Sequence, residues 1–195
     1  RKSLRERDGI IRRILVFFGG GDPSNETEKA LKALTSLNRD DIELDVVVGG
    51  ANAHRKEIRN MCASLPHATY HCQVQHMALL MVRADLAIGA GGTAIWERSC
   101  LGLPSVVTVI ADNQKELTAH LAELGMLIRL GWYDRVYPED IAAAVRTLLE
   151  KPALVKALSG AVTSLVDGLG TERVVQSIWD IISNRVDGEW YGIGG

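Results

Sequence analysis

The stretch Ile14-Leu15-Val16-Phe17-Phe18-Gly19-Gly20-Gly21 decides the fold of this chain. Its five apolar residues follow one another without alternation, as expected of a strand that is buried on both faces of a parallel sheet. Three glycines follow, and a helical pattern begins at about residue 26. The stretch therefore predicts a β-strand, a turn of small residues and an α-helix.

The same unit recurs along the chain. Further strands are predicted at 44–48, 68–72, 85–88, 105–110 and 126–130. Helical patterns are predicted at about 26–37, 53–63, 76–83, 94–101, 114–124 and 139–150, and at 153–183 with a break at 167–170. Strands that alternate with helices of this length indicate βαβ units. We therefore predict an α/β fold with a doubly wound, Rossmann-like parallel sheet.

The composition excludes several classes of protein. The chain of 195 residues has a net charge of −2, so no broad basic surface for nucleic acid is expected. It has no run of about 18 apolar residues, so we expect no stable membrane insertion. Its three cysteines form no CxxC pair, and no signal peptide precedes the first strand. These features favour free thiols in a reducing, cytoplasmic compartment.

The chain divides into three parts by composition. Residues 1–13 are rich in charge and predict a solvated linker or helix. The sequence has no initiator Met, so we interpret 1–13 as a linker from an N-terminal domain that is absent here. Residues 14–183 form the predicted ligand-binding domain, and 184–195 a flexible tail.

Two glycine-rich turns lie at strand ends, where open parallel sheets bind their ligands. In Gly19–Asn25, glycines allow backbone to approach a ligand closely, and amides of the following helix can meet a phosphate. The turn is equally consistent with a ligand-free tight turn in which Asp22, Ser24 or Asn25 caps the helix.

Gly89–Glu97 is the more informative turn. Gly91 and Gly92 remove side chains where a diphosphate would lie, and the Thr93 hydroxyl and nearby free amides would bind its oxygens. Thr93 and Glu97 are four residues apart and share one helix face, so Glu97 is placed to accept both hydroxyls of a ribose. The alternative is that Glu97 is an ordinary surface residue. Trp96 is expected to pack inward.

A third cluster, Ala111-Asp112-Asn113-Gln114, leaves two interpretations open. Asp112 or Asn113 can be a helix cap, and two amides in sequence equally suit the hydroxyls of a sugar. We expect no metal site. His71 and Cys72 are adjacent on a strand and point to opposite faces, and the spacing of Cys62, His67, His71, Cys72 and His76 matches no zinc finger.

Four segments together resemble a known family: 18–25 (FGGGDPSN), 84–104 (ADLAIGAGGTAIWERSCLGLP), 111–114 (ADNQ) and 167–174 (DGLGTERV). They look like the C-terminal domain of the UDP-sugar hydrolases of pseudaminic acid synthesis, which act on UDP-2,4-diacetamido-2,4,6-trideoxy-β-L-altropyranose. Relatives of these hydrolases are spore-coat polysaccharide proteins. More distantly, the pattern is similar to the UDP-GlcNAc transferase of peptidoglycan synthesis, which shares the glycosyltransferase-B fold.

The resemblance implies a role for each matching residue. Gly20, Gly21, Gly91, Gly92 and Thr93 would bind the diphosphate, and Glu97 the ribose. Gln73 and Val74 would meet uracil, largely through backbone groups. Asn113 and Gln114 would face the sugar. The resemblance implies no cofactor and no metal, and it places the catalytic histidine in the absent N-terminal domain.

The expected function is that of the nucleotide-binding half of a UDP-sugar hydrolase, in which UDP leaves and water attacks the anomeric carbon. This chain by itself is expected to bind UDP without appreciable turnover. Two alternatives stay open: the UDP-sugar-binding domain of a glycosyltransferase, and a non-catalytic nucleotide-sugar-binding module. The expected partners are the UDP-sugar and the N-terminal domain.

Overall fold

A six-stranded parallel sheet forms the centre of the molecule. The computed structural model describes residues 4–186, with the side chains of 184–186 left aside. The strands are β1 Arg13–Phe17, β2 Glu43–Val48, β3 Ala68–Cys72, β4 Leu86–Ala90, β5 Ser105–Val109 and β6 Ile128–Trp132. They lie in the order β3-β2-β1-β4-β5-β6, and every neighbouring pair is parallel. The predicted doubly wound fold is confirmed.

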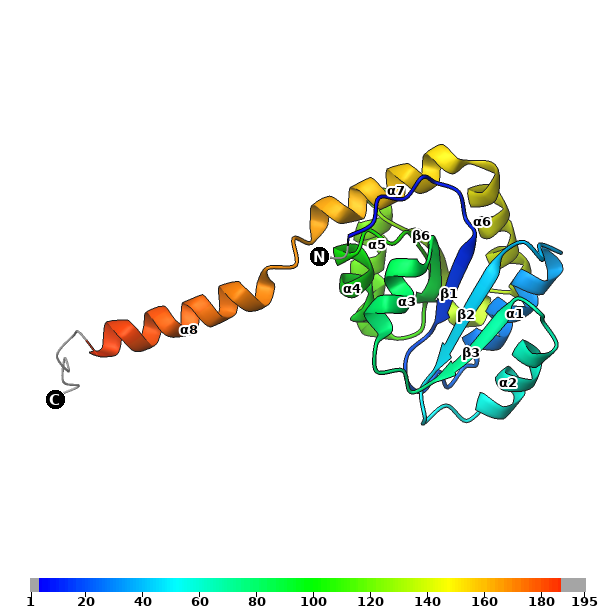
Figure 1. Ribbon diagram of the computed structural model, residues 1–195, viewed down its shortest axis with the longest axis horizontal. Helices are drawn as coiled ribbons and strands as arrows, with labels where there is room; N and C mark the ends of the chain where they lie inside the picture. Colours follow the sequence, from blue (N-terminus) through cyan, green and yellow to red (C-terminus); the bar gives the residue numbers. More distant parts are fainter. Residues whose placement is uncertain (1–3, 187–195) are drawn as a thin grey trace.

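Helices flank the sheet on both faces (Figure 1). They are α1 Glu26–Ser36, α2 Arg55–Ala63, α3 Met77–Arg83, α4 Ala94–Cys100, α5 Lys115–Glu123, α6 Pro138–Glu150, α7 Pro152–Leu165 and α8 Gly170–Val186. Short 3-10 turns, η1 Asp112–Gln114 and η2 Tyr133–Arg135, follow β5 and β6. Helices α1, α2 and α6 pack on one face of the sheet, and α3, α4 and α5 on the other.

Burial on both faces explains the unbroken apolar run of β1. Ile14 and Val16 belong to the larger core, under α1, α2 and α6. Leu15 points to the opposite face and packs with Val47 and Met81. Because consecutive strand residues face opposite ways, a strand between two helical layers needs apolar side chains at every position.

The last strand departs from its predicted range. Gly131 was expected to end the strand, but β6 continues through it to Trp132. Gly131 has φ +127°, and the pairing with β5 shifts register between Val107 and Thr108. Glycine tolerates this backbone conformation, so here it marks an irregularity inside a strand, a role that glycine often has.

The charged N-terminal segment is attached to the domain by two arginines. Arg7 is buried, and its guanidinium donates hydrogen bonds to the carbonyl oxygens of Ala84 (3.0 Å), Leu101 (2.6 Å) and Met81 (3.0 Å). Arg5 pairs with Asp85. The expectation that the whole segment is solvated is therefore wrong for Arg7. That the segment links two domains stays a prediction.

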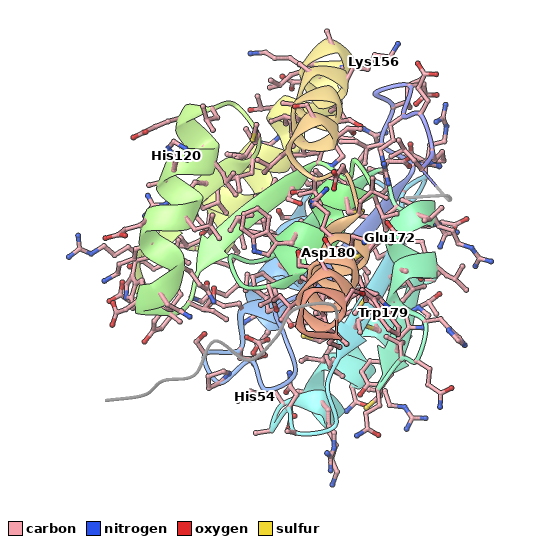
Figure 2. All side chains as sticks on the ribbon, turned by 90° about the vertical axis from the view of Figure 1, so that its left-hand side faces the viewer. His54, His120, Lys156, Glu172, Trp179 and Asp180 are labelled. Atoms are coloured by element: carbon pink, nitrogen blue, oxygen red, sulfur yellow. The ribbon has the colours of Figure 1, made fainter. Side chains whose placement is uncertain are left out.

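Helix α8 projects away from the sheet and its helices (Figure 1). It carries apolar side chains on its surface, including Ile178, Trp179 and Ile182, and Trp179 is 60% exposed. Figure 2 looks along this helix, with Trp179 and Asp180 in front of the domain. The predicted flexible tail overlaps the end of α8 at 184–186, and its remainder lies outside the described residues.

The C-terminal helical region also resembles a membrane span in length and composition. Residues 152–183 are apolar enough to cross a membrane by these two criteria. The helical backbone is interrupted between Leu165 and Gly170, which separates α7 from α8. A membrane-spanning helix needs roughly 17–25 consecutive residues, so α7 with 14 residues is too short and α8 with 17 is at the lower limit.

Candidate functional site

The glycine turns meet at the centre of the sheet. Strands β1 and β4 are neighbours, with Phe17 opposite Gly89. Chain order reverses at this pair, because β1 is followed by β2 on one side and β4 by β5 on the other. Such a topological switch point leaves a crevice outside the carboxyl ends of the strands, where ligands bind.

A cleft of about 430 Å³ occupies this switch point. Its lining includes five of the residues predicted from the sequence: Gly20, Gly21, Gly92, Thr93 and Gln114. A larger groove, about 730 Å³, lies between the N-terminal segment and α7. Its lining residue Arg5 pairs with Asp85, directly before β4, so the groove is at the amino ends of the strands. The central cleft is therefore the candidate site.

In the first turn, Asp22 caps α1, and Gly20 and Gly21 form an open loop before it. The buried Asp22 carboxylate accepts hydrogen bonds from the amides of Glu26 (2.9 Å) and Thr27 (3.0 Å) and from the Thr27 hydroxyl (2.6 Å). The amides at the start of α1 are thus already bonded, contrary to the expectation that they would meet a phosphate. Gly20 and Gly21 remain open, with nothing within 4 Å of an added Cβ.

The second turn offers free backbone donors. Thr93 begins α4 without a side-chain capping bond and is exposed. Within the part of the chain that the structure describes, the amides of Gly92, Thr93 and Ala94 donate no hydrogen bond. An unbonded helix start carries partial positive charge and suits an anion. The two turns together therefore form a neutral, donor-lined cleft.

Gln114 holds the second turn in place. Its buried side chain accepts hydrogen bonds through Oε1 from the amides of Gly91 (3.2 Å) and Ile110 (3.1 Å). A Cβ on Gly91 would lie 2.5 Å from Thr118 Cγ2, so Gly91 lets the turn approach α5 closely. Nε2 of Gln114 lies 3.6 Å from the Cβ position of Gly92 at the cleft. Gln114 therefore both positions the turn and lines the site.

The other predicted residues lie at the same edge of the sheet but do not line this cleft. Glu97 is exposed on α4, and Asn113 is exposed in η1. Gln73 and Val74 follow β3, two strands from β1. That region packs closely against the first turn: a Cβ added to Gly49 would lie 2.1 Å from the carbonyl oxygen of Gly20, and one added to Gly50 would lie 2.1 Å from the side-chain Nε2 of Gln73.

Two neighbours on α4 differ from expectation. Trp96 was expected to pack inward, but it is 42% exposed. Arg98, which the sequence pattern did not single out, is buried with 3% exposure under the second turn. A charged side chain in a short helix is usually solvated, so only the packing reveals this position. Burial lowers the pKa of the Arg98 guanidinium to about 10, so it stays protonated at neutral pH.

Glu26 is a second buried charge near the first turn. Its side chain is fully buried, and Lys29 Nζ lies 2.8 Å from Oε1. Burial raises the pKa of the Glu26 carboxyl, and the ion pair with Lys29 opposes that rise. Since the folded pKa lies above the unfolded value, ionisation of Glu26 costs stability, and the cost appears as the pH rises through the folded pKa.

Replacing Glu26 by Gln should therefore stabilise the protein at high pH relative to the wild type. We expect the difference in melting temperature, variant minus wild type, to be more positive at about pH 8 than at about pH 4, because the unfolded carboxyl titrates near 4.3. Thermal unfolding followed by circular dichroism at both pH values measures it. A difference that becomes more negative at high pH would mean that the Lys29 ion pair outweighs desolvation.

The described part of the chain contains no group of three His, Cys, Asp or Glu side chains able to hold a metal ion. His71 instead hydrogen-bonds to Asp45 through Nε2 (2.8 Å), and Cys62 is buried in the core. The groups that residues 4–186 present at the cleft are backbone amides, a hydroxyl and an amide side chain, which are groups suited to an anion.

A parallel sheet of this strand order with a glycine-lined cleft at its switch point defines a doubly wound, Rossmann-like α/β domain. The chain belongs to the glycosyltransferase family 28 C-terminal domain family, whose model matches residues 14–165. The spore coat polysaccharide biosynthesis protein SpsG of Bacillus subtilis is 30% identical over 176 residues, which are 90% of this chain and 52% of that protein. The chain thus spans about half the length of this relative.

Solved structures share the fold. MurG of Acinetobacter baumannii superimposes with a TM-score of 0.70 at 20% identity, over 87% of this chain and 50% of that one. A co-structure of MnaA from S. aureus with UDP gives a TM-score of 0.67 at 15% identity, over 93% of this chain and 48% of that one. The glycosyltransferase-B type of fold expected from the resemblance is confirmed.

Proposed function

We propose that this chain is the nucleotide-sugar-binding half of a glycosyltransferase-B-type enzyme and that its ligand is a UDP-sugar. The observation that carries the proposal is the cleft between β1 and β4, where two glycine turns face one space and the amides of the second turn are unbonded. A diphosphate fits such a site because it is compact, anionic and rich in hydrogen-bond acceptors. Structures of the same fold hold nucleoside diphosphates, MnaA with UDP and the rhamnosyltransferase SpnG with thymidine diphosphate, which supports a ligand of this class.

Each predicted residue has a proposed role in this site. Gly20, Gly21, Gly92 and Thr93 line the cleft and would bind the diphosphate. Gly91 would contribute indirectly, because its amide is bonded to Gln114.

The outer residues would bind the rest of the ligand. Glu97 is proposed for the ribose. Gln73 and Val74 are proposed for uracil. Asn113 and Gln114 are proposed for the sugar, with Gln114 reaching it from the cleft wall.

The reaction that the family supports best is transfer of the sugar to an alcohol acceptor. In such a reaction the UDP leaving group gains negative charge, which donors preorganised around the diphosphate stabilise. Membership of a glycosyltransferase family favours this alternative over the hydrolysis suggested by the resemblance to pseudaminic acid enzymes. Hydrolysis would use the same cleft and leaving group with water as the acceptor.

The rest of the enzyme would supply the catalytic base and the acceptor site. The chain covers 52% of SpsG, so a second domain of comparable size is the proposed partner. A cytoplasmic location fits a nucleotide-sugar ligand and the three free cysteines. No cofactor or metal enters the proposal.

Titration calorimetry of this chain with UDP, CMP and AMP tests the proposal. We expect UDP to bind at millimolar concentration or below and to bind more tightly than CMP or AMP. We also expect UDP-sugars to stay intact in its presence, because the base is proposed to lie in the other domain. Absence of UDP binding at millimolar concentration would overturn the proposed ligand. Robust turnover by this chain would overturn the proposal that the catalytic base lies in the other domain.

A further inference from the structure

Arg98 is a buried cation with an incomplete set of partners. It extends from α4 beneath the second glycine turn, and its side chain is almost wholly inaccessible. Its Nη2 donates a hydrogen bond to Ala90 O at 2.8 Å. Its Nε is buried without a hydrogen-bond partner, and no carboxylate of the described residues lies within salt-bridge distance. A buried charge of this kind is costly to a fold unless something compensates it.

Arg7 shows how the same side chain is buried when its role is structural. Its Nε, Nη1 and Nη2 donate to three different carbonyl oxygens, which join the N-terminal segment to α3 and α4. It lies at the amino ends of the strands, near Ala84. Arg98 instead lies at the carboxyl ends, and a Cβ on Gly89 would come within 2.8 Å of its Nη1. The two buried arginines thus differ in how many of their nitrogens have hydrogen-bond partners and in the end of the sheet at which they lie.

The position of Arg98 connects it to the candidate site. Its acceptor, Ala90, lines the cleft and directly precedes the turn at Gly91 and Gly92. Ala94, one turn before Arg98 on the same helix face, also lines the cleft. The guanidinium therefore lies behind the wall of the cleft, where the low dielectric of the interior strengthens its field.

We propose that Arg98 is a positioning residue whose buried, unpaired charge raises the affinity of the cleft for the diphosphate and fixes the turn that binds it. This inference rests on the proposed function for its ligand. The charge acts through the wall, while the hydrogen bond to Ala90 O holds the turn that presents the amides of Gly92 and Thr93. The charge of Glu97 acts on Arg98 without a salt bridge between them, and a bound dianion then supplies further countercharge at this place.

Two neutral replacements separate this role from an ordinary structural one. Arg98→Met keeps much of the volume and removes the charge, and Arg7→Met is its matched control. For Arg98→Met we expect the affinity for UDP and for inorganic pyrophosphate to fall about fivefold, the affinity for uridine to stay unchanged, and the melting temperature to be equal or higher. For Arg7→Met we expect a lower melting temperature, because three carbonyl oxygens lose their donor, and unchanged affinities of the folded protein.

Calorimetry with UDP, pyrophosphate and uridine, together with thermal unfolding, gives every readout. Arg98→Lys, which keeps the charge, should retain most of the pyrophosphate affinity; if Arg98→Met fails to fold, Arg98→Gln takes its place. Unchanged pyrophosphate affinity in the neutral variant, or an equal loss for uridine, would overturn the role of the charge. If the wild type binds pyrophosphate but binds UDP no more tightly than CMP or AMP, the proposed ligand is wrong and the role of Arg98 can still hold. If the wild type binds neither pyrophosphate nor UDP, the proposed ligand and the role of Arg98 are both wrong.

Discussion

Gly89→Ala is expected to destabilise the domain by about 3 kcal/mol or more, at or above the upper end of the usual cost of overpacking. A Cβ on Gly89 would lie 2.2 Å from the carbonyl oxygen of Phe17 in the paired strand β1 and 2.8 Å from Nη1 of Arg98. The first of these atoms is backbone at the centre of the sheet, so the methyl group can be accommodated only if β1 and β4 move apart. Packed interiors resist such a movement.

Gly92→Ala is the matched control. The nearest atom to a Cβ at that position is Gln114 Nε2 at 3.6 Å, an ordinary van der Waals distance. We expect its free energy of unfolding to lie within about 0.5 kcal/mol of the wild type, as for most substitutions that disturb no packing. If the proposed function holds, this variant should lose affinity for UDP, because the methyl group enters the space of the diphosphate.

Urea denaturation and thermal unfolding measure both variants. For a chain of this size a loss of about 3 kcal/mol corresponds to a fall in melting temperature of roughly 6–12 °C. Equal stability of the two variants would show that the strand pair around Gly89 yields easily. It would also mean that Gly89 is not required by the packing of the sheet, so that Gly89 and Gly92 could not be assigned different roles on this basis.

The fold could be predicted because its signals are local. An unbroken apolar run such as 14–18 indicates a strand that is covered on both faces. Small residues after each strand indicate where the turns occur. The predicted strand and helix boundaries agree with the structure to within three residues. The deviation at Gly131 arose because a glycine was interpreted as a terminator although it lies at a register shift within β6.

The site could be predicted only in part, because some of its residues act through contacts between distant segments. The two glycine turns were identifiable from their own sequence, and the structure brings both to one cleft. That Gln114 bonds to the amide of Gly91, 23 positions earlier, depends on the pairing of β4 with β5, because η1 follows β5. Arg98 was missed for the same reason, since nothing in its neighbours along the chain shows that its charge is buried.

Asp22 illustrates how one residue type can mislead. A carboxylate in a glycine-rich turn can cap the following helix, or the turn can leave the amides of that helix free for a ligand. The sequence left both possibilities open. The structure shows Asp22 bonded to the start of α1, which removes those amides from the candidate site. The proposed anion site therefore lies nearer the second turn, where Thr93 has no capping bond.

The second large effect is expected at Glu97, whose replacement by Ala should weaken UDP binding about tenfold or more without loss of fold. Glu97 is exposed on α4, one turn beyond Thr93 and on the same helix face, and it makes no salt bridge among residues 4–186. A carboxylate only accepts hydrogen bonds, so it suits two vicinal hydroxyls and repels phosphate. Hydrogen bonds to a charged group contribute about 1.5–3 kcal/mol each, and 1.4 kcal/mol is a factor of ten.

Calorimetry with UDP and with pyrophosphate distinguishes a ribose ligand from a general effect on the cleft. Pyrophosphate has no ribose, so its affinity for Glu97→Ala should change little. Glu123→Ala, which removes an exposed carboxylate from the last turn of α5, controls for the change in net charge. Glu97→Gln keeps one carbonyl acceptor and should lose less UDP affinity than Glu97→Ala. If Glu97→Ala bound UDP as the wild type does, or weakened UDP and pyrophosphate alike, Glu97 would be an ordinary surface residue and the ribose would have to be held elsewhere along the edge of the sheet.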